Sequence, residues 1–393
     1  MLQLSFVNFK KGSYLVVEGK NTSDRFLIIR DGKVVCRRRE EIPGEHQQIL
    51  GAGDFVGVIP CMAARSQIET VIALTDVSAI SVRRDQYPEL IERNIPVAMK
   101  IIRTFTKQLR LMNETLTKLT LNNVLTDTPE QLFGIAAYYE KVGKPDISVY
   151  GYYQYLKACR NGKNFAKARQ RFVALKPVTH AVYFEPTKDI LRWYPKDTMI
   201  FSECQLGTDM FIIQEGKVKI TKVVDGNEVT LAVLKKGDIF GEMALLENKP
   251  RSASAIAHED CRVMVVNSEN FNQMVTTQAQ LVARLTTMFA ERLWALYRQI
   301  MNSQLENPIH KMIDMLALEL EKQRIQTDTD ASYQTDLTIA DIENMCGIPQ
   351  NMQGQYIYKF MENSNIKIVD KKIYVKDCLE LYKEAAFYRK RKA

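Results

Sequence analysis

The 393-residue chain lacks the features that mark membrane, secreted and metal-binding proteins. No run of about 18 apolar residues occurs, and the N-terminal stretch lacks the basic start, apolar middle and small-residue cleavage site of a secretory signal. The seven cysteines are scattered and never form a Cys-x-x-Cys pair, and the four histidines lie far apart. We therefore expect a cytoplasmic protein with reduced thiols, no membrane partner, and no metal, haem or iron–sulfur site.

Signatures of catalysis are missing as well. The sequence has no evident pair of carboxylates, no nucleophile with a companion histidine and no Walker-type loop, so we expect that the protein is not an enzyme. The hydrophobic fraction of 46% and the charged fraction of 25% are those of a folded protein with several domains. The net charge of +8 is a mild excess that permits an anionic partner without requiring one.

The chain contains one module twice. Two stretches match without a gap at a constant offset of 184 residues, and the match preserves glycines and alternating β-branched residues. The matched glycines and acids are Gly32 with Gly216, Gly53-Asp54 with Gly237-Asp238, and Gly57 with Gly241.

Within each copy, short apolar strands alternate with turn signals such as Glu215-Gly216 and Asp225-Gly226. This spacing is typical of an antiparallel β-barrel or jelly roll. A helix with one apolar seam follows each copy, from Ile102 to Leu119 and from Val282 to Ile300. Each of these seam helices either packs on its own barrel or pairs with the other one.

Between the two copies, residues 129–175 predict three short amphipathic helices, broken at Gly143-Lys144-Pro145 and Asn161-Gly162-Lys163. The segment carries six tyrosines between positions 138 and 155 at helical spacings, and an aromatic stripe of this kind is typical of a core. Its pattern of small and aromatic residues distantly resembles a single tetratricopeptide-type hairpin.

The segment 237–255 of the second copy holds the parts of a phosphate site. Gly241 allows backbone amides to approach a phosphate, and Arg251 offers a rigid fork to two phosphate oxygens. Glu242 is placed to accept a hydrogen bond from a ribose 2′-hydroxyl, which a 3′,5′-cyclic phosphate leaves free. The turn that begins at Met243 would direct its amides at the same anion. The alternative is that Glu242 and Arg251 form a surface ion pair.

Through Phe240-Gly-Glu-Met-Ala-Leu-Leu and Pro250-Arg-Ser-Ala, this segment resembles the phosphate-binding cassette of the cyclic-nucleotide-binding domain superfamily. The resemblance implies a ligand site made of Gly241, Glu242, Met243, Ala244, Arg251, Ser252 and Ala253. Serine rather than threonine after Arg251 favours cAMP over cGMP. The family's base-contacting Thr-Ser pair corresponds to Leu296-Tyr297, so Tyr297 is expected to stack on the purine.

The first copy departs from this cassette at both polar positions. At the offset of 184, Val58 stands where Glu242 is expected and Gln67 where Arg251 is expected. A neutral glutamine cannot supply the charge-assisted hydrogen bonds, worth about 1.5–3 kcal/mol each, that an arginine gives a phosphate. We predict that the first barrel is structural, and we leave open whether Arg65, two residues before Gln67, takes the place of the missing arginine.

From Phe271 onward, the order of elements resembles the catabolite-activator (Crp/Fnr-type) family of bacterial regulators. We expect one long helix from Phe271 to about residue 304 and a second over 308–324. Residues 337–349 look like the family's helix-turn-helix, with Thr338 as N-cap and Gly347 at the turn. Two strands, 366–369 and 372–375, look like its two-stranded wing.

Whether this region binds DNA is less settled by the sequence. The second helix of the family's motif opens with two arginines and a glutamate. At those places of the expected helix this chain has Gln350, Asn351 and Gln355, followed by Lys359 on the same helix. Amide side chains pair with adenine edges, and the basic cluster 389–392 would add non-specific attraction to a phosphate backbone.

The sequence thus predicts an α+β protein with two antiparallel β-barrel or jelly-roll nucleotide-binding domains, each followed by a long helix, a helical insert between them and a C-terminal winged helix. The expected boundaries are a degenerate barrel over 1–95, a seam helix over 96–123, the insert over 124–178, a nucleotide-binding barrel over 179–270, a seam helix over 271–305 and a winged helix over 306–393. We expect a cAMP-dependent, Crp-like transcriptional regulator. The alternative is a nucleotide-responsive scaffold that acts through protein partners. Pairing of the seam helices would make the chain an internal pseudo-dimer, or else a homodimer.

Overall fold

The computed structural model describes residues 4–20, 24–39, 42, 47–121, 128–185, 187–224, 226–247, 249–325, 331–348 and 352–391. The chain forms two compact units, one from residues 1–90, 111–122 and 286–393 and the other from 91–110 and 123–285. Among the described residues, no helix is both long and apolar enough to span a bilayer.

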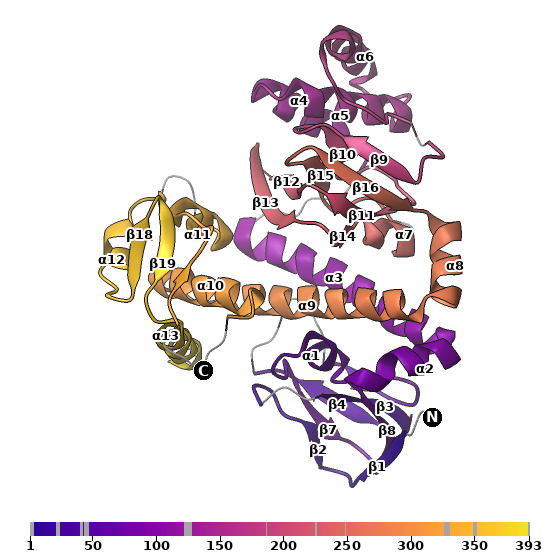
Figure 1. Ribbon diagram of the computed structural model, residues 1–393, viewed down its shortest axis with the longest axis vertical. Helices are drawn as coiled ribbons and strands as arrows, with labels where there is room; N and C mark the ends of the chain where they lie inside the picture. The colour runs from indigo at the N-terminus through magenta and orange to yellow at the C-terminus, as the bar shows by residue number, and fades with distance from the viewer. Residues whose placement is uncertain are drawn as a thin grey trace. The chain divides into compact units, whose positions relative to one another are not determined.

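Each unit contains one barrel made of two four-stranded antiparallel sheets (Figure 1). The strands of the first barrel are β1 (Ser5–Phe9), β2 (Tyr14–Val16), β3 (Arg25–Asp31), β4 (Val34–Arg37), β5 (Ile49–Leu50), β6 (Phe55–Val56), β7 (Thr70–Ala73) and β8 (Val77–Arg83). Those of the second are β9 (Leu191–Tyr194), β10 (Met199–Phe201), β11 (Met210–Glu215), β12 (Val218–Val224), β13 (Asn227–Leu234), β14 (Ile239–Phe240), β15 (Ser254–Ala257) and β16 (Cys261–Val266).

The two barrels have the same topology. The first barrel has the strand orders β1-β8-β3-β6 and β2-β7-β4-β5, and the second has β9-β16-β11-β14 and β10-β15-β12-β13. Every strand of one barrel therefore has its counterpart at the same position in the other. The duplication that the sequence predicts is confirmed, as is the antiparallel barrel architecture.

The glycines preserved in the repeat have a steric reason. Gly32 and Gly216 adopt φ angles of +95° and +77°. A Cβ atom at these positions would lie 2.3 Å from the Asp76 carbonyl oxygen and 2.2 Å from that of Asp260. Only glycine combines this backbone conformation with such a close approach of another chain segment.

The helix after the first barrel forms as expected, but the helix after the second is interrupted. The first is α3 (Ile95–Leu121), which follows α1 (Val58–Ala63) and α2 (Tyr87–Arg93). The second barrel, which contains α7 (Glu242–Glu247), is followed by α8 (Ser268–Thr277) and then by α9 (Ala279–Ser303). The single helix predicted from residue 271 is therefore wrong, because Gln278 has the non-helical angles φ −132° and ψ 68°.

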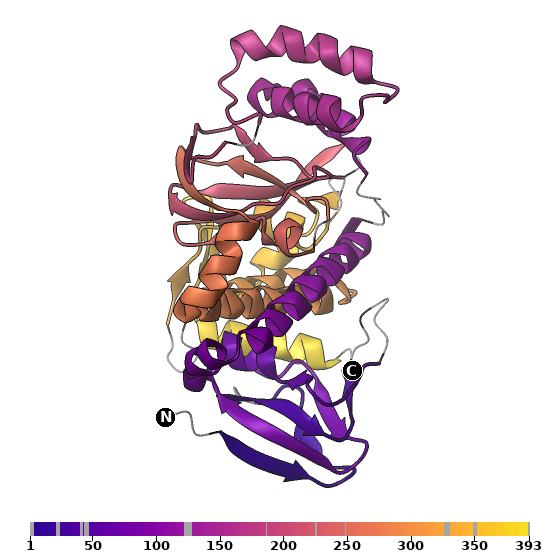
Figure 2. The same ribbon diagram turned by 90° about the vertical axis from the view of Figure 1, so that its right-hand side faces the viewer.

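The insert consists of α4 (Gln131–Lys141), α5 (Pro145–Ala158) and α6 (Phe165–Leu175), with breaks where the sequence predicts them. It belongs to the same compact unit as the second barrel and covers one of its sheets (Figure 2). Its buried tyrosines share one apolar cluster with Met199, Cys204 and Ile256 of that barrel. The expected role of the tyrosine stripe as core is confirmed: Tyr139, Tyr150, Tyr152 and Tyr155 are each at most 3% exposed.

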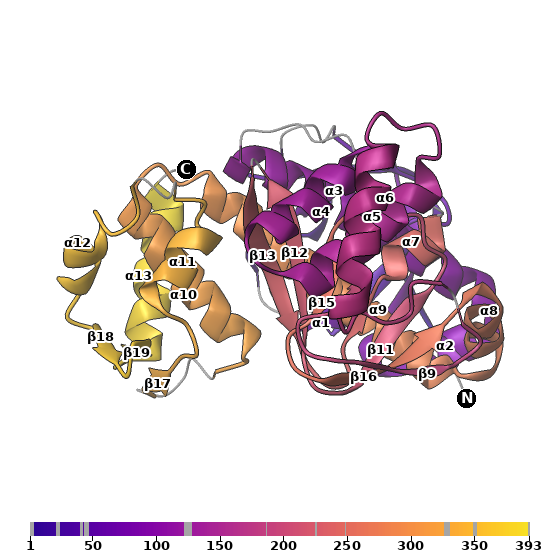
Figure 3. The same cartoon turned by 90° about the horizontal axis from the view of Figure 1, so that it is seen from above.

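The described part of the C-terminal region combines helices with a small sheet (Figure 3). The elements are α10 (Pro308–Lys322), β17 (Tyr333–Gln334), α11 (Ile339–Met345), α12 (Ile357–Met361), β18 (Ile366–Val369), β19 (Lys372–Val375) and α13 (Cys378–Arg391), with the strand order β17-β19-β18. Thr338 caps α11 as predicted, because its hydroxyl accepts the Asp341 N–H at 3.2 Å. The predicted strand pair is also present, and its turn at Asp370 and Lys371 has φ angles of +50° and +64°.

Candidate functional site

The candidate cassette follows strand β14 in the second barrel. Gly241 ends the strand with φ +77°, and a Cβ atom there would lie 2.8 Å from Arg251 Nη1. Helix α7 begins at the next residue, Glu242. The glycine therefore both turns the chain and leaves room for the guanidinium group that lies against it.

Arg251 is held inside the barrel by main-chain oxygens. Its Nη1 donates to the Gly241 carbonyl at 2.5 Å and its Nη2 donates to the Asp209 carbonyl at 2.6 Å. Its Cζ lies 4.3 Å from the centroid of the Phe201 ring, so the guanidinium also stacks on an aromatic face. These contacts fix the fork in one plane and one direction.

The guanidinium group is buried but incompletely bonded. Arg251 is only 5% exposed, and its Nε has no hydrogen-bond partner in the part of the chain that the structure describes. Burial lowers the pKa of Arg251 to about 10, while Tyr150, Asp209 and Glu242 act in the opposite direction. The group is thus still charged at neutral pH, and a buried cation with a spare N–H is suited to an anion with two adjacent oxygens.

The remaining predicted residues lie around the same turn. Glu242, Met243 and Ala244 are 1%, 6% and 1% exposed. The Ser252 hydroxyl lies 3.8 Å from Met243 Sδ, and Ala253 is 9% exposed. Because Glu242 and Arg251 are both buried, the alternative of a solvent-exposed surface pair is wrong. The structure therefore brings the whole predicted cassette together, except for Tyr297.

A neighbouring segment, Ser202–Asp209, also builds the site, and the sequence analysis missed it. Cys204 and Gln205 exchange backbone hydrogen bonds with Arg251, both at 2.9 Å. A Cβ atom at Gly207 would lie 2.6 Å from Arg251 Nη2, so the segment packs directly on the guanidinium. No signal in the repeat points to it, because the residue matching Gly207 in the first copy is Ser23.

The corresponding place in the first barrel carries no charge. Gln67 is 5% exposed, and its Oε1 would lie 3.6 Å from a Cβ atom at Gly57. Gln67 thus packs against Gly57 in the same way as Arg251 packs against Gly241 in the second barrel. The Gln67 Oε1 has no hydrogen-bond partner among the described residues. Val58 begins α1 at the position of Glu242 and is buried. An amide thus fills the site of the guanidinium without offering a phosphate any positive charge.

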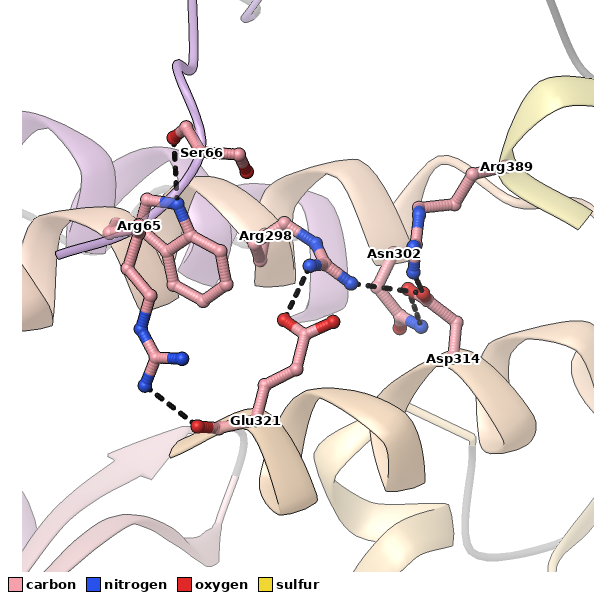
Figure 4. A network of polar contacts seen from close by, with 8 residues as sticks. Arg65, Ser66, Arg298, Asn302, Asp314, Glu321 and Arg389 are labelled. Atoms are coloured by element: carbon pink, nitrogen blue, oxygen red, sulfur yellow. Dashed lines mark hydrogen bonds and ion pairs between the residues drawn. The ribbon is translucent and has the colours of Figure 1, made fainter. Parts of the chain in front are cut away.

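Arg65 does not replace the missing arginine, because its head group is used elsewhere (Figure 4). Its Nη2 donates to the Glu321 carbonyl at 2.7 Å, at the C-terminal end of α10. Its Cζ also lies 5.1 Å from the centroid of the Trp294 ring on α9. The indole N–H of Trp294 in turn donates to the Ser66 carbonyl at 3.3 Å. In the first barrel, the loop that corresponds to the second cassette therefore contacts α9 and α10 through Arg65 and Ser66.

Tyr297, expected to stack on the purine, contacts the first barrel instead. Its hydroxyl lies 3.2 Å from Glu18 Oε1, and Arg38 Cζ lies 5.6 Å from its ring centroid. These residues all belong to the compact unit that holds the first barrel. The structure therefore does not bring Tyr297 together with the second cassette within one unit.

A buried ion network joins α9, α10 and α13 (Figure 4). Asp314 is fully buried and accepts hydrogen bonds from Arg298 Nη2 at 3.3 Å, from Asn302 Nδ2 at 3.1 Å and from Arg389. Arg298 also donates to Glu321 at 2.7 Å. Arg389, the first residue of the C-terminal basic cluster, is therefore half-buried and engaged by Asp314.

The predicted nucleic-acid residues are only partly described. Gln350 and Asn351 lie outside the described residues. Gln355 and Lys359 are exposed, but the helix expected to carry all four begins only at Ile357. The prediction of a helix running through Gln355 is wrong, because Gly354 has φ +85° and donates its N–H to Glu343 at 2.8 Å.

In the ranges that the structure describes, no group of three or more His, Cys, Asp or Glu residues is placed to hold an ion. The seven cysteines all lie in described ranges, are buried and form no disulfide with one another.

Comparison with known proteins agrees with the geometry of the two barrels. The family model described as "Cyclic nucleotide-binding domain" matches residues 6–94 and 191–278. The chain therefore contains two copies of the cyclic nucleotide-binding domain, one in each barrel.

Three relatives illustrate the range of proteins that share this domain. The Cyclic AMP receptor protein of Thermus thermophilus is 35% identical over 103 residues, which are 26% of this chain and 48% of that protein. The cGMP-dependent protein kinase 2 of Homo sapiens is 38% identical over 94 residues, 23% of this chain and 12% of the kinase. The CRP-like cAMP-activated global transcriptional regulator of Mycobacterium tuberculosis is 23% identical over 198 residues, 49% of this chain and 86% of the regulator. The chain thus spans less than half the length of the first two relatives.

Proposed function

We propose that this regulatory protein binds one cyclic nucleotide per chain, in the second barrel, and that cAMP is preferred to cGMP. The observation that carries the proposal is the buried Arg251, with a spare N–H beside the Gly241 turn, set against the neutral Gln67 at the same place in the first barrel. A cyclic phosphate would replace the two carbonyl partners of Arg251 and use its unpaired donor. Glu242 would accept from the ribose 2′-hydroxyl.

The preference for cAMP is supported by Ser252 and by the likeness to relatives named for cAMP. The likeness to a cGMP-dependent kinase makes the base an experimental question. We would titrate cAMP, cGMP and a cyclic dinucleotide into the full chain by calorimetry. The expected result is one cAMP site per chain, with weaker binding of the other two.

Two variants separate the barrels in this titration. Arg251→Ala should abolish the binding, whereas Gln67→Ala, at the equivalent place in the first barrel, should leave both stoichiometry and affinity unchanged. Two equivalent sites per chain, or binding that survives Arg251→Ala, would refute the assignment. Circular dichroism of each variant checks that it is folded.

We further propose that the C-terminal region is a winged helix that acts on DNA in a Crp-like transcriptional regulator. Support comes from the capped α11, the strand pair of β18 and β19, and the likeness to a regulator of Mycobacterium tuberculosis over most of that protein's length. Gel shifts with genomic fragments, with and without cAMP, test this proposal. A cAMP-dependent shift that is lost in Gln355→Ala or Lys359→Ala supports it.

The scaffold alternative is favoured by one specific observation. Arg389 is bonded to Asp314, and Tyr358, on the helix that carries Lys359, is 85% exposed. A helix with an exposed aromatic ring and a single lysine suits a protein partner better than a phosphate backbone. Failure of every DNA fragment to shift, combined with intact nucleotide binding, would favour this function.

We also propose that α3 and α9 pair within one chain and make the monomer a pseudo-dimer. Both helices carry an apolar seam, and each contributes residues to both compact units. Multi-angle light scattering should give the mass of a single chain. An obligate two-chain particle would show that the seam of α9 serves a homodimer instead.

A further inference from the structure

The helical insert contacts the segment that positions Arg251. Segment 202–209 is bonded on one side to the cassette, through the paired backbones of Gln205 and Arg251. On its other side it meets α4 and α5 of the insert within the same compact unit. The insert is therefore one contact away from the candidate phosphate site.

Two side chains of the segment make these contacts with the insert. Cys204 Sγ donates to Gln131 Oε1 of α4 at 3.1 Å. Gln205 Nε2 lies 3.3 Å from the hydroxyl oxygen of Tyr150 on α5, and Gln205 Oε1 accepts the Ser202 N–H at 3.0 Å. Tyr150 thus bonds the side chain of the residue whose carbonyl accepts the Arg251 N–H.

The segment has a conformation that needs such support. Cys204 has φ +63°, in the left-handed region that is strained for a residue with a side chain. Two other residues of the segment contact Arg251 Nη2. The Asp209 carbonyl accepts its hydrogen bond, and Gly207, which has no Cβ atom, packs against it. A shift of this segment would move both the backbone and the head group of Arg251.

We propose that Tyr150 is a positioning residue for Arg251, so that the insert sets the affinity of the second barrel for a cyclic nucleotide. This inference rests on the proposed function of that barrel. The hydroxyl of Tyr150 orients Gln205, Gln205 fixes the main chain at Arg251, and the guanidinium is thereby held at the place where the phosphate binds. Conversely, a ligand that draws Arg251 away from the Asp209 carbonyl shifts segment 202–209. Because Gln205 of this segment contacts Tyr150, the shift changes the contacts of α5.

The test compares two buried tyrosines of the insert whose hydroxyls contact different residues of the barrel. Tyr150→Phe removes the bond to Gln205. Tyr139→Phe is the matched control, because Tyr139 is also buried and its hydroxyl lies 3.1 Å from Thr221 Oγ1 on strand β12 of the same barrel instead of against Gln205. We expect Tyr150→Phe to weaken cAMP binding about three- to tenfold, the loss of one hydrogen bond, and Tyr139→Phe to leave it unchanged.

A double-mutant cycle distinguishes positioning from general destabilisation of the fold. In a Gln205→Ala background, Tyr150→Phe should cost no further affinity, because the contact it removes is already absent. Equal losses for Tyr150→Phe and Tyr139→Phe, or additive losses in the cycle, would overturn the proposal. Thermal unfolding of each ligand-free variant measures the structural effect separately.

A second measurement does not depend on nucleotide binding. In the ligand-free protein, hydrogen exchange of the Arg251 amide reports its bond to the Gln205 carbonyl. We expect faster exchange in peptides covering 202–209 and 250–253 in Tyr150→Phe but not in Tyr139→Phe. Failure of all cyclic nucleotides to bind the wild type would refute the proposed function alone, whereas unchanged exchange in Tyr150→Phe would refute the role of Tyr150.

Discussion

The buried Asp314 provides a quantitative test of how α9, α10 and α13 are held together. Its carboxylate is inaccessible to solvent and accepts hydrogen bonds from two arginines and one asparagine. Asp314→Ala would leave Arg298 with its bond to Glu321. The same change would remove the carboxylate that accepts a hydrogen bond from Arg389. Removing one member of a buried ionic network typically costs about 3–5 kcal/mol, because the remaining charges stay desolvated. We expect Asp314→Ala to lower the free energy of unfolding of this region by about that amount.

Trp294 makes the measurement local. The chain has two tryptophans, and Trp193, which is 48% exposed, is replaced by phenylalanine so that Trp294 alone fluoresces. Trp294 lies beside Arg298, with the guanidinium carbon 5.3 Å from its ring centroid. Urea titration followed at Trp294 therefore reports unfolding around the network. Asp314→Asn, which keeps the shape and one acceptor, should cost less than Asp314→Ala.

Glu319 supplies the control on the same helix. Its ion pair with Lys322 at 2.5 Å is partly exposed, and such pairs contribute about 0–1 kcal/mol. Glu319→Ala should therefore leave the urea midpoint nearly unchanged. If Asp314→Ala and Glu319→Ala shift the midpoint equally, the network does not hold these helices together and the reasoning from burial is wrong.

Three further predictions concern the cassettes and the C-terminal region. Gly207→Ala should weaken cAMP binding about tenfold or more by pushing a methyl group against Arg251, as calorimetry would show, whereas Gly134→Ala, with no atom within 4 Å, should not. Thr338→Ala should destabilise the C-terminal region by about 1 kcal/mol through loss of the α11 cap, measured by urea titration; no change would contradict the capping role. Arg65→Ala should speed hydrogen exchange at the C-terminal turn of α10 by removing its bond to the Glu321 carbonyl, while nucleotide affinity stays constant; a loss of nucleotide binding would mean that the first cassette does hold a ligand.

Much of the architecture follows from local sequence patterns. The glycines repeated at the offset of 184 mark turns that only glycine can make, as Gly32 and Gly216 show, and they therefore predict the duplicated barrel. The breaks of the insert and the Thr338 cap are also local, because proline, glycine and a threonine hydroxyl act within one turn of chain. The interruption at Gln278 carries no such signal, which explains why one helix was predicted in place of two.

The residues of the second cassette could likewise be predicted, since Gly241, Glu242 and Arg251 lie within eleven positions of one another and the chain between them is short. Their partners could not. Asp209 meets Arg251, and Tyr150 meets Gln205, only when the barrel is closed and the insert is packed on it, and neither pair is close in the sequence.

The sequence by itself determined that one barrel has a guanidinium and an acid at the turn of its cassette while the other has an amide and a valine, because side-chain chemistry is local. Tertiary structure alone decided where Arg65 points, that Tyr297 meets the first barrel, and that Arg389 pairs with Asp314. Each of these depends on contacts between residues more than 70 positions apart, which no pattern of neighbouring residues encodes.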